Sequence, residues 1–103
     1  MNDLGQKLKD ILDEFCKQHH AAPTDYEIRI GTTRFGRLTG RLIWNRYDNM
    51  EVSSRQIELW DYFRHAMPPE VRKNIGTIYT TGAQEWAVEE ELQLHESARP
   101  PWM

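Results

Sequence analysis

The segment Ile28–Tyr47 constrains the fold most, because its alternation of apolar and polar residues interrupts the helical spacing on either side. The segment holds five arginines and no acidic residue, whereas the other residues carry eight lysines and arginines against sixteen aspartates and glutamates. A chain of net charge −3 therefore divides into a segment of +5 and a remainder of −8. Arginine is suited to bidentate contact with phosphate or carboxylate, so we expect a partner to dock here.

This region predicts a β-hairpin. Residues 26–30 alternate between apolar and charged side chains, as in a half-buried strand. Residues 31–36 are rich in glycine and threonine and predict a turn. A second strand is expected over about residues 38–47, with several arginines of the hairpin on its solvent side.

Helices are predicted on both sides of the hairpin. Apolar residues between Leu4 and Phe15 recur on one helical face, which predicts an amphipathic first helix. Two capping boxes, Ser53 with Gln56 and Thr81 with Gln84, predict where later helices begin. The expected elements after the hairpin are a helix over residues 54–67, a short helix over 70–74, a strand over 77–80 and a helix over 83–94.

These elements predict an α+β fold in the order α-β-β-α-α-β-α. We expect a three-stranded sheet with the helices packed on one face. The length of 103 residues suits a single domain, here residues 1–96. Residues 97–103 are expected to form a flexible C-terminal tail.

The composition favours a cytoplasmic protein. A single cysteine, Cys16, excludes an internal disulfide framework. No stretch approaches the roughly 18 apolar residues of a membrane-spanning helix. The first 15 residues also lack the apolar block of a signal peptide. We therefore expect a cytoplasmic location and no membrane partner.

Short motifs occur at the landmarks of this element order. Arg34-Phe35-Gly36 follows the first strand, Arg55 and Trp60 lie on the second helix, and Tyr79-Thr80-Thr81 leads to Glu85-Trp86. In these motifs residues 26–86 resemble the BolA family, whose fold is similar to the class II KH domain. The resemblance implies a small regulatory α+β domain.

We expect no cofactor, because the sequence departs from the family at the position of its metal ligand. The family's histidine on the last strand, an iron–sulfur ligand shared with a monothiol glutaredoxin, falls near Gly76, and glycine cannot bind iron. The Gly-x-x-Gly loop of KH domains has no counterpart, because Gly36 and Gly40 are four residues apart and lie in the hairpin. The usual KH grip on a nucleic-acid backbone therefore does not carry over.

The hairpin is the candidate binding surface. A protein partner or a second copy of the chain would pair with its guanidinium groups and use exposed apolar residues such as Ile43 or Tyr62. RNA or single-stranded nucleic acid is the alternative partner, because arginines bind phosphates and aromatic rings stack on bases. A solvated face neutralised by the acidic helices is the third interpretation. The candidate binding residues are Arg29, Arg34, Arg37, Arg41, Arg46 and Tyr47.

No grouping of residues predicts catalysis or a metal site. Cys16 and His20 share one helical face, but zinc or copper needs a third or fourth ligand, and nothing in the sequence places one nearby. Nucleophile elbows, Walker loops and dinucleotide fingerprints are absent from the sequence. We therefore expect a non-enzymatic regulatory or adaptor domain.

Overall fold

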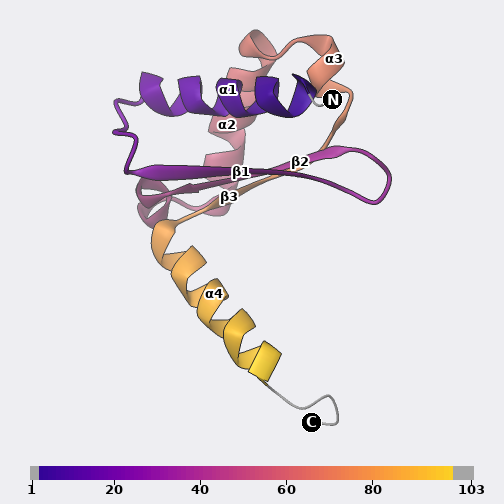
Figure 1. The fold of residues 1–103 in the computed structure, drawn as a ribbon. Helices are drawn as coiled ribbons and strands as arrows, with labels where there is room; N and C mark the ends of the chain where they lie inside the picture. The colour runs from indigo at the N-terminus through magenta and orange to yellow at the C-terminus, as the bar shows by residue number, and fades with distance from the viewer. Residues whose placement is uncertain (1–2, 99–103) are drawn as a thin grey trace.

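The computed structural model describes residues 3–98, and the side chains of residues 4–91 (Figure 1). It confirms the α+β class and the predicted order of elements, with one 3-10 helix, η1, added after the second strand. The elements are α1 (Asp3–Gln18), β1 (Tyr26–Thr32), β2 (Leu38–Trp44), η1 (Asn45–Asn49), α2 (Val52–Ala66), α3 (Pro69–Arg72), β3 (Ile75–Thr81) and α4 (Ala83–Ala98).

The three strands form one mixed sheet in the order β1-β2-β3. β1 and β2 pair antiparallel, with Tyr26 opposite Trp44 and Thr32 opposite Leu38. β2 and β3 pair parallel, and α2 and α3 supply the long crossover that a parallel pair requires. The second strand of the hairpin is therefore the central strand of the sheet.

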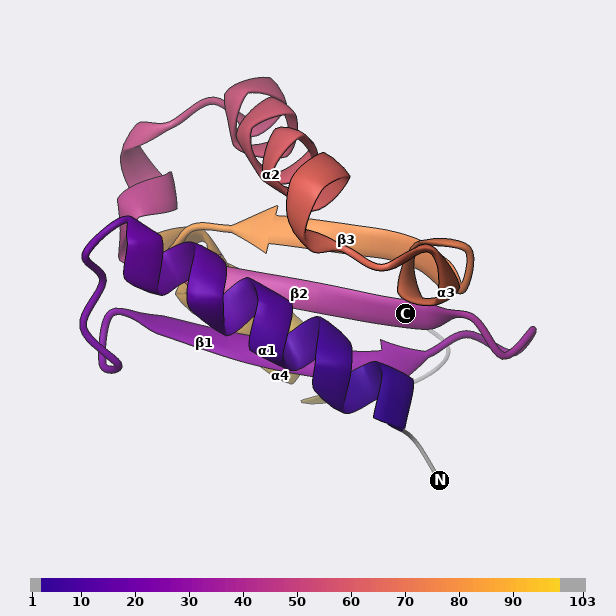
Figure 2. The ribbon, with the colours of Figure 1, turned by 90° about the horizontal axis from the view of Figure 1, so that it is seen from above.

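The core lies on the face of the sheet that α1 covers, and α2 and α3 also contribute side chains to it (Figure 2). Leu8, Leu12 and Phe15 of α1 are buried, as their helical spacing predicts. Gly40 of β2 lies beneath them, and a Cβ atom there would come within 3.1 Å of Ile78 Cδ1. The lack of a side chain at Gly40 thus leaves room for Ile78 of β3 in the core. The core is completed by Cys16, Leu38, Leu42, Trp44, Tyr47, Leu59, Phe63, Met67, Val71, Ile75 and Ile78.

The predicted second strand is too long. It ends at Trp44 rather than Tyr47, and η1 turns the chain inward. The alternation of buried and exposed residues stops before the strand does, because Leu42, Ile43 and Trp44 are all buried. Tyr47 consequently lies in the core and not on the hairpin surface.

Both predicted capping boxes are wrong, because tertiary contacts take over their groups. α2 begins at Val52 without a side-chain cap. α4 begins after Gly82, whose N–H donates to Glu85 Oε1 at 3.2 Å. The N–H of Gln84 donates to Asp48 Oδ1 of η1 at 3.0 Å. The start of α4 is therefore capped from within its own first turn and from a distant part of the chain.

α4 departs from the prediction that the helices share one face. It starts at the end of β3 and runs from the side of the sheet opposite α1 (Figure 1). It also extends to Ala98, so it includes the first two residues of the predicted tail. Residues 99–103 of that tail lie outside the described part of the chain. The sheet is thus covered by α1 on one face and only by the start of α4 on the other.

Arg55 joins the elements at this end of the sheet. It lies on α2 and is 3% exposed. Its guanidinium group donates to backbone carbonyl oxygens before α2 and on β3, and to a carboxylate on α4. These acceptors are Tyr47 O, Met50 O at 3.0 Å, Thr80 O at 3.1 Å and Glu85 Oε1. One buried charge is therefore satisfied by four separate acceptors, as a buried charge must be.

Side chains of α2 also cover the outer edge of β3. Gln56 Nε2 donates to Ile78 O at 3.0 Å, and Arg55 Nη1 donates to Thr80 O. Trp60 Nε1 donates to Gln56 Oε1 at 2.9 Å and so orients the amide. Figure 2 shows α2 alongside β3, on the opposite side of the sheet from β1. These carbonyl oxygens are therefore not free to pair with another strand.

We expect Arg55→Lys to lower the free energy of unfolding by about 2–4 kcal/mol, because an ammonium group cannot serve four separate acceptors and leaves buried ones unpaired. Chemical denaturation measures the change. Arg64→Lys on the same helix is the control, since its side chain is 72% exposed and should change stability by less than about 0.5 kcal/mol. Equal losses in the two variants would contradict a special role for Arg55.

Candidate functional site

The structure places the five arginines of the predicted binding surface in three separate environments. Arg29 and Arg41 lie on the open face of the sheet, Arg34 and Arg37 lie near the turn of the hairpin, and Arg46 lies in η1. A single arginine surface is therefore not formed.

Arg29 and Arg41 are opposite each other in the β1–β2 register. Both guanidinium groups stack on the ring of Trp86 of α4, at 4.9 Å and 4.8 Å from its centroid. Arg41 also lies 4.7 Å from the ring centroid of Tyr79, and these residues border a shallow hollow of about 270 Å³. The like charges of the facing strands are thus held apart by an aromatic ring between them.

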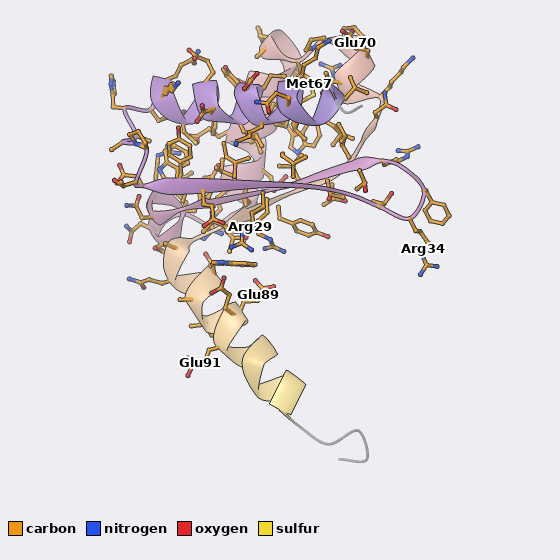
Figure 3. All side chains as sticks on the ribbon, viewed as in Figure 1. Arg29, Arg34, Met67, Glu70, Glu89 and Glu91 are labelled. Atoms are coloured by element: carbon orange, nitrogen blue, oxygen red, sulfur yellow. The ribbon has the colours of Figure 1, made fainter. Side chains whose placement is uncertain are left out.

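Acidic residues neutralise this pair. Arg29 contacts Glu27 of its own strand and lies 3.8 Å from Glu90 of α4. Arg41 Nη1 lies 3.7 Å from Glu89 and donates a hydrogen bond to Thr81 Oγ1 at 2.8 Å. Figure 3 shows Arg29 and Glu89 on the same side of the sheet. The acidic stretch of the last helix therefore balances the arginines of the strands, in line with the third interpretation of the sequence.

Arg46 is neutralised at the other end of the hairpin. Its two terminal nitrogens donate to the two carboxylate oxygens of Glu58 on α2, one of them at 2.9 Å. Its guanidinium group also lies 5.1 Å from the ring centroid of Trp44. The hydrogen bonds from Arg46 lower the pKa of Glu58 below its usual value of 4.5. This arginine therefore joins η1 to α2.

Arg34 and Arg37 lie in the hairpin tip, which we define as residues 33–37. Figure 3 shows Arg34 at the far end of the hairpin, pointing away from the body of the protein. Phe35 between them is 85% exposed. Within residues 4–91, neither arginine lies within 4.0 Å of a carboxylate. The tip therefore presents one aromatic ring and two unpaired cations.

The hairpin tip is held by its own hydrogen bonds. Thr33 Oγ1 accepts from the N–H groups of Phe35 and Arg37 at 3.2 Å and 3.1 Å. The backbone N–H of Thr33 donates to Arg37 O at 2.8 Å. Gly36 has a φ of +80°, in the left-handed region that favours glycine. The conformation of the tip is therefore specified locally by threonine and glycine.

Tyr47 is the one predicted binding residue that the structure removes from the surface. It is fully buried, and its ring lies 5.2 Å from that of Trp44. Burial raises the pKa of its hydroxyl. That hydroxyl has no hydrogen-bond partner among the described residues. The prediction that Tyr47 stacks on a ligand is wrong, because η1 turns this residue into the core.

Several expectations about aromatic and apolar residues are also corrected. Tyr79, predicted in the core, is 49% exposed on the open face. Ile43, predicted as an exposed contact, is 6% exposed, and it lines a second hollow together with Ala83 at the start of α4. Tyr62 packs against Phe15, with 5.1 Å between ring centroids. The alternation of apolar and polar residues around Tyr79 could have predicted that its side chain is exposed. The burial of Ile43 depends on α4, which the sequence does not place.

Cys16 is fully buried in the core. Burial, with a smaller contribution from Asp13, raises the pKa of its thiol to about 12. His20 ends the turn after α1 with a φ of +62° and is exposed. No three His, Cys, Asp or Glu residues gather as metal ligands within the described ranges. The thiol is thus protonated at neutral pH and is held as an apolar group.

Comparisons with protein-family models, curated proteins and solved structures find no significant match to this chain. The resemblance to the BolA family therefore stays a prediction. Among the described helices, none combines the length and the apolar character needed to span a membrane.

We expect Tyr47→Phe to raise the free energy of unfolding by about 1 kcal/mol, because it removes a buried hydroxyl that has no partner in the described structure and keeps the packed ring. Thermal and chemical denaturation measure the change. Tyr26→Phe is the control and should lower the free energy of unfolding, since the Tyr26 hydroxyl donates a hydrogen bond to Asp13. A loss of stability in Tyr47→Phe would show that its hydroxyl is bonded in solution.

Acid should destabilise the protein through Glu58 and Glu85. Hydrogen bonds from Arg46 and Arg55 lower their pKa values below 4.5 in the fold. Their contribution to the free energy of unfolding is therefore fully present above the pKa values of the unfolded chain, and it is lost as the pH falls through the lower pKa values of the folded protein. We expect Glu58→Gln to lose roughly 0.5–1 kcal/mol at pH 7 and to flatten the decline in stability between about pH 5 and pH 3. Identical pH profiles for wild type and variant would contradict this assignment.

Proposed function

We propose that the protein is a non-enzymatic adaptor domain that binds an acidic protein partner through the hairpin tip. The observation that carries the proposal is the side chain of Phe35, which is 85% exposed between two unpaired arginines. Large aromatic residues and arginines are the side chains that dominate binding energy in protein interfaces. The partner would supply an apolar pocket for the ring and carboxylates for Arg34 and Arg37.

The distribution of charge supports the hairpin tip over the rest of the hairpin. Arg29, Arg41 and Arg46 already have carboxylate partners in the same chain. A ligand that used these groups would first have to displace those partners and the ring of Trp86. The arginines of the tip need no such displacement. The part of the hairpin that is open to a new partner is therefore much smaller than the sequence suggests.

The local hydrogen bonds of the hairpin tip support the proposal, because they hold the loop in one conformation before a partner binds. The turn is held by Thr33 and by the left-handed conformation of Gly36. A preorganised loop loses less conformational entropy when its partner arrives. Tip residues can thus contribute to affinity even though their contact area is small.

Single-stranded nucleic acid is the second candidate, and one observation favours it. Tyr79 is 49% exposed on the open face of the sheet and lies beside Arg41, an arrangement on which a base could stack. The carboxylates of Glu89 and Glu90 lie on the same face and would repel phosphates. The protein partner is therefore the better supported of the two.

The proposal is tested with a peptide library of acidic sequences, each carrying one large apolar residue, and the affinities of selected peptides are measured by fluorescence polarisation. We expect Phe35→Ala and the double variant Arg34→Ala/Arg37→Ala each to weaken binding about tenfold or more. The matched control is Arg64→Ala/Arg72→Ala, which removes the same charge from exposed positions outside the tip.

Equal loss in the control would show that net charge, and not the tip, governs binding. The same variants are then titrated with mixed-sequence single-stranded RNA at low and moderate salt. A strongly salt-dependent complex that is lost in Arg34→Ala/Arg37→Ala, without peptide binding, would replace the protein partner with nucleic acid. A complex lost only on Tyr79→Ala would move the site to the open face.

A further inference from the structure

We infer that the free edge of β1 binds β1 of a second copy of this chain, which joins two sheets into one of six strands. The inference is independent of the proposed function, because it uses backbone groups and side chains outside the hairpin tip. It rests on three observations: an open edge, a self-complementary order of residues along that edge, and a closed edge on the other side of the sheet.

The hydrogen-bond phase of β1 follows from the bonds at its two ends. Asn45 N–H donates to Asp25 O, and Thr33 N–H donates to Arg37 O. In an antiparallel pair the residues that bond to the partner alternate, so the odd-numbered residues between these ends bond to β2. The backbone groups of Tyr26, Ile28 and Ile30 therefore point away from the sheet. No side chain of the described residues bonds to them.

The order of side chains along β1 is self-complementary about Ile28. An antiparallel pair centred there places Ile28 opposite Ile28 of the second copy. It places Glu27 opposite Arg29 of the second copy, and Arg29 opposite the second copy's Glu27, so the contact that these two residues make within one chain is exchanged for two contacts between the copies. On the face of the sheet that carries Ile28, it places Tyr26 opposite Ile30 of the second copy. Opposite charges and apolar pairs directly across two strands are the favourable combinations.

Neighbouring registers lack this match. A pair centred on Arg29 would set the two Arg29 side chains against each other, and one centred on Glu27 would set carboxylate against carboxylate. The register centred on Ile28 also uses the residues whose backbone groups point outward, so each Ile28 exchanges both of its hydrogen bonds with the other copy. The phase of the hydrogen bonds permits all three registers, because each of them sets even-numbered residues opposite one another, and the order of charges favours the one centred on Ile28.

The closed edge of β3 limits the assembly to two copies. Side chains of Arg55 and Gln56 already occupy its outer carbonyl oxygens. A sheet with one open edge pairs once through a twofold axis, whereas a sheet with two open edges continues into a fibre. The expected product is a closed, symmetric dimer.

The test uses sedimentation velocity over a range of concentrations of the full chain. Wild type is expected to show a concentration-dependent dimer. Glu27→Arg and Arg29→Glu each create two pairs of like charges between the β1 strands of the two copies. Each variant should raise the dimer dissociation constant about tenfold or more. An equimolar mixture of the two variants restores both opposite-charge pairs, so native mass spectrometry should find the mixed dimer and little of either homodimer.

Circular dichroism and thermal unfolding establish that both variants are folded before they are mixed. The double variant Glu27→Arg/Arg29→Glu reverses both charges in one chain and should dimerise like wild type. A wild-type chain that stays monomeric at high concentration overturns the inference, as does a mixture that forms no mixed dimer. Phe35→Ala should leave the dimer intact, so failure of the tip as a binding site and failure of this pairing are told apart.

Discussion

The buried guanidinium group of Arg55 is the interaction on which the rest of the structure depends. It binds carbonyl oxygens before α2, a carbonyl oxygen near the end of β3 and a carboxylate in the first turn of α4 at once. A buried charge is tolerated only where every donor finds an acceptor, so these elements must meet in one arrangement. Two properties of the surface follow from that arrangement: the outer edge of β3 is covered, and α4 starts on the face of the sheet opposite α1.

The position of α4 in turn decides which charges are available to a partner. Its Trp86 separates Arg29 from Arg41, and its carboxylates balance them. The division of the sequence into basic and acidic parts is thus largely cancelled inside the molecule. Among the arginines of the hairpin and η1, those without a carboxylate within 4.0 Å in residues 4–91 are Arg34 and Arg37 of the hairpin tip.

The two proposed surfaces are compatible with each other. The hairpin tip lies at one end of β1, and an antiparallel pair of β1 strands would carry the two tips to opposite ends of the joint sheet. A dimer would then offer two equivalent sites. Binding to a partner with repeated acidic segments would gain from the effective concentration of the second site.

The sequence by itself determined the class and order of elements, because apolar spacing and turn residues act over a few neighbouring positions. It predicted correctly which face of α1 is buried and that half-buried and exposed side chains alternate along β1. Only the tertiary structure decided the positions of Tyr47, Ile43 and the capping residues, because they depend on the turn into η1, on α4 and on contacts such as Gln84 with Asp48 and Gln56 with Ile78. Such contacts leave no periodic signal. Charge shows where arginines are concentrated, whereas pairing with Glu58, Glu89 and Glu90 depends on which elements the fold brings together.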